Sequence, residues 1–80
     1  MTNHTASDFA PIAANPYALA LDCQRVASKL ALERRYEEAV REYLVSVTYL
    51  RMSSNSDAAA QIAFAEGEIE RLETVTGGSR

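Results

Sequence analysis

Two amphipathic stretches joined by a very short hinge constrain this chain more than any other feature. The first stretch ends near Leu32, and beyond Arg34 and Arg35 the apolar pattern resumes and runs on to Leu50. Neither stretch can bury its apolar stripe alone, and so short a connection makes two helices fold back on each other. The sequence therefore predicts an antiparallel helical hairpin.

Apolar periodicity predicts three helices, and we find no pattern typical of a β-strand. Asn15 and Pro16 mark the first helix start, because asparagine is a favoured cap and proline suits the first helical position. The helices are expected at residues 16–33, 36–52 and 57–75. The predicted fold is an all-α, antiparallel three-helix bundle over residues 15–76, with a flexible arm at 1–14 and the start of a linker at 77–80.

Each expected helix has an apolar face that can enter a shared core. On the first helix a row of larger side chains has an alanine edge beside it, which would let another helix approach closely. The second helix has a broad face that Leu44 widens, as suits a helix packed between two others. The three faces consist of Leu19, Cys23, Val26 and Leu30 with Ala20, Ala27 and Ala31; of Tyr36, Ala39, Val40, Tyr43, Val47 and Leu50; and of Ala58, Ile62, Ala65, Ile69 and Leu72.

Composition argues against several classes of function. The chain of 80 residues has a net charge of −3 and no clustered basic footprint, so nucleic-acid binding is not expected. No apolar run approaches the ~20 residues of a membrane span, and the first residues lack the pattern of a signal peptide. Cys23 is the single cysteine, which rules out an internal disulfide and favours a reducing compartment such as the cytoplasm.

Residues suited to catalysis are scarce. His4 is the only histidine and Cys23 lies on an apolar stripe, where a buried and inert thiol is expected. The three glycines form no phosphate-binding loop. We therefore expect no enzyme activity, no cofactor and no metal site.

The pattern Tyr36-x-x-Ala39-x-x-x-Tyr43 resembles the hairpin shared by tetratricopeptide repeats and microtubule-interacting and trafficking (MIT) domains. In both families a small residue of the first helix opposes the aromatic residue that opens the second. Ala27 stands at that small position, and Ala39 would let the two helices touch.

Two residues depart from the family pattern. Arg34 occupies a position where the families often have glycine, so a left-handed turn there would be strained, and Ser46 replaces a preferred alanine. A tetratricopeptide unit of about 34 residues needs stacked neighbours, yet no second copy follows Leu50. The plan of two helices and a longer third one, over residues 16–75, is similar to an MIT domain.

The resemblance implies a non-catalytic adaptor that binds a short helical segment of a partner in a groove between helices. By resemblance the partner would be an ESCRT-III tail or a subunit of an autophagy lipid-kinase complex. The protein would then be cytoplasmic and recruited to endosomal or autophagic membranes.

Surplus apolar side chains predict where such a partner binds, since contiguous exposed apolar patches tend to mark interaction sites. We expect Val45, Tyr49 and Met52 of the second helix to face Phe64 of the third. The first helix has surplus residues of its own, which are Tyr17, Leu21 and Leu32, and Phe64 shares a flank of the third helix with Glu68, Arg71 and Val75.

An acidic stripe of Glu66, Glu70 and Glu73 is expected on the other flank of the third helix, where it would orient a basic ligand. The alternative is a solvated face, or pairing with Arg41 or Arg51.

Two other functions stay open. The apolar surplus could serve a self-associating homodimer. Alternatively, the chain could be a microtubule-contacting module like those of severing ATPases, although its basic residues are scattered over Arg25, Lys29, Arg34, Arg35 and Arg41.

Overall fold

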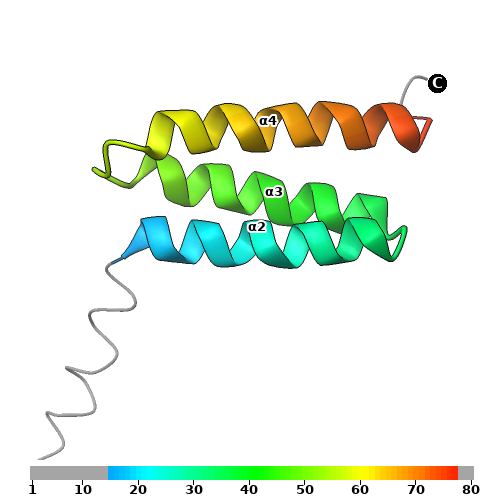
Figure 1. Cartoon of the computed structure of the whole chain (residues 1–80), viewed down its shortest axis with the longest axis horizontal. Coiled ribbons are helices and arrows are strands. Elements are labelled where there is room, and N and C mark those ends of the chain that lie inside the picture. The colour runs from blue at the N-terminus through cyan, green and yellow to red at the C-terminus, as the bar shows by residue number, and fades with distance from the viewer. Residues whose placement is uncertain (1–14, 78–80) are drawn as a thin grey trace, which may run out of the picture.

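The computed structural model describes residues 15–77, which form three α-helices lying side by side, with α3 between α2 and α4 (Figure 1). Helix α2 spans Pro16–Leu32, α3 spans Tyr36–Arg51 and α4 spans Ala58–Val75. Each end lies within one residue of the range expected from the sequence. The fold is an all-α three-helix bundle, and the expected arm at 1–14 and residues 78–80 lie outside the described residues.

The first helix starts and stops through specific caps. Asn15 Oδ1 accepts a hydrogen bond from the Ala18 N–H at 3.2 Å, and Pro16 occupies the first helical position. At the other end Arg34 has a φ of +66°. This is the left-handed conformation expected at a position where tetratricopeptide and MIT hairpins often have glycine. The N–H groups of Arg34 and Arg35 donate to the carbonyls of Ala31 and Leu30, each at 2.9 Å. This is the paired bonding of a Schellman cap, which reverses the chain within three residues.

The seam between α2 and α3 is built from small residues. Ala20, Ala27 and Ala39 have no exposed surface, as expected for backbones that approach closely. Ser46 is also fully buried, and its hydroxyl donates to the Tyr43 carbonyl at 2.7 Å, so its polar group is satisfied within α3. Serine thus fits where the repeat pattern prefers alanine.

The sequence assigned two larger side chains to the core wrongly. Val26 was expected on the buried stripe of α2 but is 45% exposed, and Leu44 was expected to widen the buried face of α3 but is 51% exposed. Because the alanine row of α2 makes the close contact, the neighbouring row of larger residues is displaced to the flank of the seam.

Helix α3 links the other two helices through a common core. The larger core cluster joins Ala27, Ala39, Tyr43, Val47, Ala65 and Leu72, and the smaller one joins Ala20, Leu50 and Ala58. Ile62 of α4 packs against both clusters. By contrast, α2 and α4 scarcely contact each other.

Candidate functional site: the groove between α2 and α4

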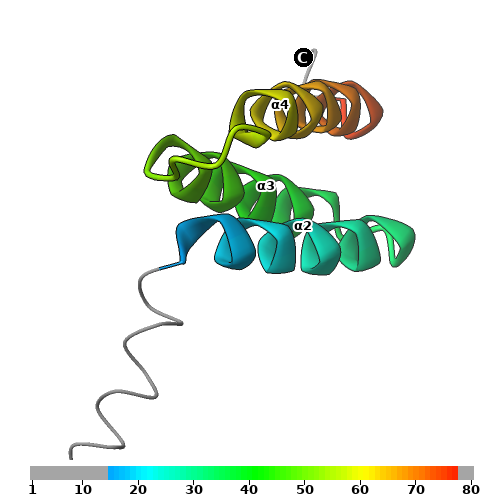
Figure 2. The ribbon, with the colours of Figure 1, turned by 60° about the vertical axis from the view of Figure 1, so that its left-hand side comes forward.

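Helices α2 and α4 lie on either side of α3, as a second view shows (Figure 2), and they scarcely contact each other. Side chains of all three helices line a groove between α2 and α4, which contains a hollow of about 330 Å³. Its floor comes mainly from α3 and its walls from α2 and α4. The residues that line the hollow are Ser28, Ala31, Leu32, Tyr36, Tyr43, Glu68, Arg71, Leu72 and Val75.

Tyr43 holds the floor of the groove in place. Its side chain is only 1% exposed, and its hydroxyl lies 3.2 Å from Ser28 Oγ of α2. The Phe64 ring of α4 meets the Tyr43 ring edge to face, with 6.2 Å between ring centroids and an interplanar angle of 77°. One buried tyrosine therefore contacts both walls, and such aromatic pairs are worth about 0.5–1.5 kcal/mol beyond their buried area.

Exposed apolar side chains lie along both walls. On α2, Leu21, Ser28 and Leu32 share one row because their spacings are seven and four residues. On α4, Phe64 and Val75 lie in a row with Glu68 and Arg71 for the same reason. Leu32 is 85% exposed, and Leu21, Phe64 and Val75 are each more than a third exposed. Leu32 and Val75 line the hollow, and Leu21 and Phe64 continue the same two rows along their helices.

The charged groups of the groove compensate each other. Arg71 Nη2 donates to Glu68 Oε1 at 2.6 Å, and the pair lies within the α4 wall. This pairing raises the pKa of Arg71. The wall carries no net charge, so the groove favours an apolar ligand surface over a strongly charged one.

Gln24 is a polar side chain that the sequence reasoning missed. It precedes Ser28 by one helical turn on α2, yet it is only 7% exposed, and its Nε2 is buried without a hydrogen-bond partner. The sequence signal that could have identified this residue is its position between Ala20 and Ala27, in the row of α2 that forms the seam with α3.

Phe64 does not face Val45, Tyr49 and Met52, contrary to what the sequence had predicted for a groove between α3 and α4. Phe64 contacts Tyr43, and at about 100° per residue these three side chains project from nearly the opposite side of α3. Val45 and Met52 are exposed there, while Tyr49 packs against the smaller core cluster. The periodicity identified the surplus residues but not the helix each row faces.

The acidic stripe lies on the opposite flank of α4 from the groove. Glu66 pairs with Arg51 of α3 at 3.5 Å, one of the alternatives that the sequence left open. Glu70 and Glu73 are exposed and make no ion pair within residues 15–77. The exposed ion pair between Arg51 and Glu66 contributes little to stability, since such pairs are typically worth about 0–1 kcal/mol.

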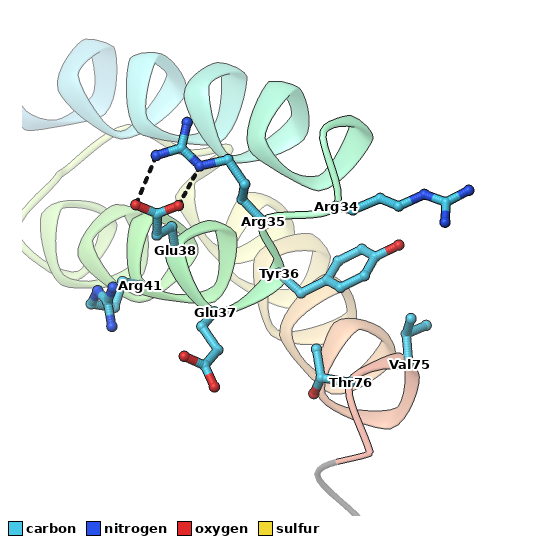
Figure 3. A pocket seen from close by; sticks show the side chains of 8 residues that line it. All are labelled: Arg34, Arg35, Tyr36, Glu37, Glu38, Arg41, Val75 and Thr76. Atoms are coloured by element: carbon cyan, nitrogen blue, oxygen red, sulfur yellow. Dashed lines mark hydrogen bonds and ion pairs between the residues drawn. The ribbon is translucent and has the colours of Figure 1, made fainter.

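A second hollow lies at the end of the bundle, beside the turn from α2 to α3 (Figure 3). It brings together Arg34, Arg35 and Arg41, which looked scattered in the sequence, but interleaves them with Glu37 and Glu38. Arg35 donates to both carboxylate oxygens of Glu38, at 2.5 and 2.9 Å, and this pairing lowers the pKa of Glu38. In Figure 3 the Arg34 side chain points away from that pair. The surface is mixed in charge and presents no uniform basic face.

Groups suited to chemistry are not assembled in the described part of the chain. Burial, followed by the charge and hydrogen bond of Glu42, raises the pKa of the Cys23 thiol, which reduces its thiolate fraction. Histidine, cysteine and acidic residues between positions 15 and 77 form no group of three that could hold a metal ion. Within the same range no helix is both long and apolar enough to cross a membrane.

A scan against protein-family models and searches of curated proteins and solved structures find no match for this chain. The groove between α2 and α4 is accordingly defined by the geometry of the chain itself: an aromatic floor, two apolar rims and one ion pair, with the unpartnered amide of Gln24 buried one helical turn from Ser28.

Proposed function

We propose that this domain is a protein-interaction adaptor that binds a short helical segment of a partner protein in the groove between α2 and α4. The observation that supports the proposal is that exposed Leu32 and Val75 line a hollow above Tyr43, while exposed Leu21 and Phe64 continue the same two rows along α2 and α4. Amphipathic helices commonly bind in such grooves through apolar anchors spaced by three or four residues. A bound helix would pack against α2 and α4 and cover the floor that they leave open.

The amount of exposed apolar surface favours a single helix over a second copy of the domain. The four rim side chains are only partly exposed, from 38% for Leu21 to 85% for Leu32. A stable dimer of folded domains needs about 800 Å² on each partner, which is more than four such side chains supply. One amphipathic helix therefore matches the rims better than a homodimer does.

The MIT resemblance supplies the candidate partners. An ESCRT-III tail or a subunit of an autophagy lipid-kinase complex would provide the helical segment, and binding would recruit the protein from the cytoplasm to endosomal or autophagic membranes. The acidic stripe of Glu66, Glu70 and Glu73 lies on another flank of α4, so it would form a separate contact with a basic partner.

The test uses the 80-residue chain and a displayed library of 18-residue amphipathic helices with equal numbers of lysine and glutamate. Fluorescence anisotropy of a selected peptide then measures the affinity. Leu32→Asp should weaken binding at least tenfold, because it places a charge against the apolar face of the ligand. Val26→Asp is the matched control on the same helix, since Val26 is exposed but does not line the groove.

Three results would contradict the proposal. The library could yield no binder, or Leu32→Asp and Val26→Asp could weaken binding equally. Binding could also be lost in Leu44→Asp and in neither other variant, which would show that the binding site lies at the other edge of α3. A concentration-dependent mass that Leu32→Asp abolishes would favour the homodimer, and microtubule binding lost on neutralising Arg34 and Arg35 would favour the severing-ATPase alternative.

A further inference from the structure

Among the described residues two polar side chains are buried, Gln24 and Ser46, and they differ in their hydrogen bonding. Ser46 is satisfied by the Tyr43 carbonyl, whereas Gln24 Nε2 has no partner. Turning the amide by 180° would leave its oxygen in the same buried position, so one end lacks a partner in either orientation. Buried polar groups in native proteins are almost always hydrogen-bonded, and each exception needs an explanation.

The position of Gln24 in the fold provides an explanation for its unpartnered amide. It lies three residues after Leu21 and four before Ser28, at the foot of the α2 wall and beside the alanine seam. The nearby hydroxyls of Ser28 and Tyr43 are 3.2 Å apart and bond to each other. An unused hydrogen-bonding group therefore lies one helical turn from Ser28, next to the residues that line the hollow.

A purely structural role does not account for this residue. An apolar side chain of similar volume would fill the same space without an unsatisfied amide, and such replacements are neutral or stabilising. A residue that lowers stability at a candidate binding site is instead typical of function.

On the basis of the proposed function, we infer that the partner helix carries an asparagine or glutamine within its apolar face, and that this amide pairs with Gln24. Gln24 then determines which amphipathic helices the groove accepts. Its flexible side chain turns the amide into the groove when the helix binds.

A carboxamide is the side chain that fits the site best. Its oxygen accepts from Gln24 Nε2 and its nitrogen donates to Gln24 Oε1, so both ends of both amides are paired. Buried asparagine pairs act in this way in coiled coils, where they select partner and register at a cost in stability. A leucine would leave Gln24 unsatisfied, and a carboxylate would bury a charge in a wall that already holds Glu68.

The test is an asparagine scan of one probe. An 18-residue, charge-balanced amphipathic helix with an all-leucine apolar face is compared with versions that carry asparagine at each apolar position in turn. The wild-type chain should bind one asparagine version at least tenfold more tightly than the all-leucine helix. An aspartate at that same position should give no gain in affinity over the all-leucine helix.

Gln24→Leu should reverse this preference and raise the melting temperature by a few degrees, because it removes the unsatisfied amide. Gln24→Met, which is flexible and of similar length, is the second variant and should behave in the same way. Leu32→Asp should weaken binding of every probe, whichever residue stands at the scanned position.

The outcomes separate the two proposals. Binding of the all-leucine helix that Leu32→Asp abolishes, with no preference for asparagine, would overturn the inference and leave the adaptor function standing. An asparagine preference that persists in both Gln24 variants would also overturn it. If none of these probes binds, both proposals fail. A dimer that dissociates in Gln24→Leu would mean that a second copy supplies the amide, and would likewise overturn the inference.

Discussion

Replacing Arg34 by glycine should stabilise the domain, although it deletes a long side chain. Arg34 holds a φ of +66° at the Schellman cap of α2, and a left-handed conformation costs a residue with a Cβ about 1–2 kcal/mol. Glycine avoids that strain but makes the unfolded chain more flexible, which costs about 0.4–1 kcal/mol. Arg34 is exposed and makes no ion pair within residues 15–77, so no favourable contact is lost.

The net expectation for Arg34→Gly is a gain of about 0.5–1 kcal/mol in the free energy of unfolding. In a domain of this size that gain corresponds to a rise of about 2–8 °C in melting temperature. Thermal unfolding followed by circular dichroism measures it. Arg34→Ala is the matched control, since alanine keeps the Cβ and should show no comparable gain. The reasoning is refuted if glycine lowers the melting temperature, or if alanine raises it equally.

Three further predictions concern the seam, the floor and the thiol. Ala39→Leu should lower the free energy of unfolding by about 1–3 kcal/mol in urea denaturation, because the α2–α3 seam has no space for a larger side chain. Tyr43→Phe should cost about 1 kcal/mol, and a double-mutant cycle should show a smaller cost in a Ser28→Ala background, where the hydroxyl pair is already broken. Cys23 should react with a thiol-specific dye more slowly than free cysteine at pH 8, and Glu42→Gln should speed the reaction, because burial and Glu42 raise the pKa of the thiol.

Local signals in the sequence predicted the helices well. The Asn15 cap and Pro16 fixed the start of α2, and the small residues Ala27 and Ala39 marked the contact between α2 and α3. Arg34 in a glycine position correctly pointed to a strained turn. These features depend on a few neighbouring residues, which is why one sequence suffices to find them.

The site was harder to predict because it depends on how the helices are rotated against each other. Hydrophobicity ranked Val26 and Leu44 above the alanines, although close packing brought the alanine row into the seam and left the larger side chains half exposed. A rotation of this kind also turned Phe64 toward Tyr43 and away from Val45. Periodicity defines rows on a helix, but only the packed structure shows which rows meet.

The scarcity of contacts between α2 and α4 has a consequence for folding and for hydrogen exchange. Nearly all contacts join helices adjacent in the sequence, and such low contact order favours rapid folding. Helix α4 is held almost entirely by α3, so it can open as a unit while the hairpin of α2 and α3 remains folded. Its amide hydrogens should therefore exchange before those of the hairpin. A helix bound in the groove would contact both α2 and α4. Slower hydrogen exchange throughout α4 would then show that the bound helix holds α4 against the hairpin.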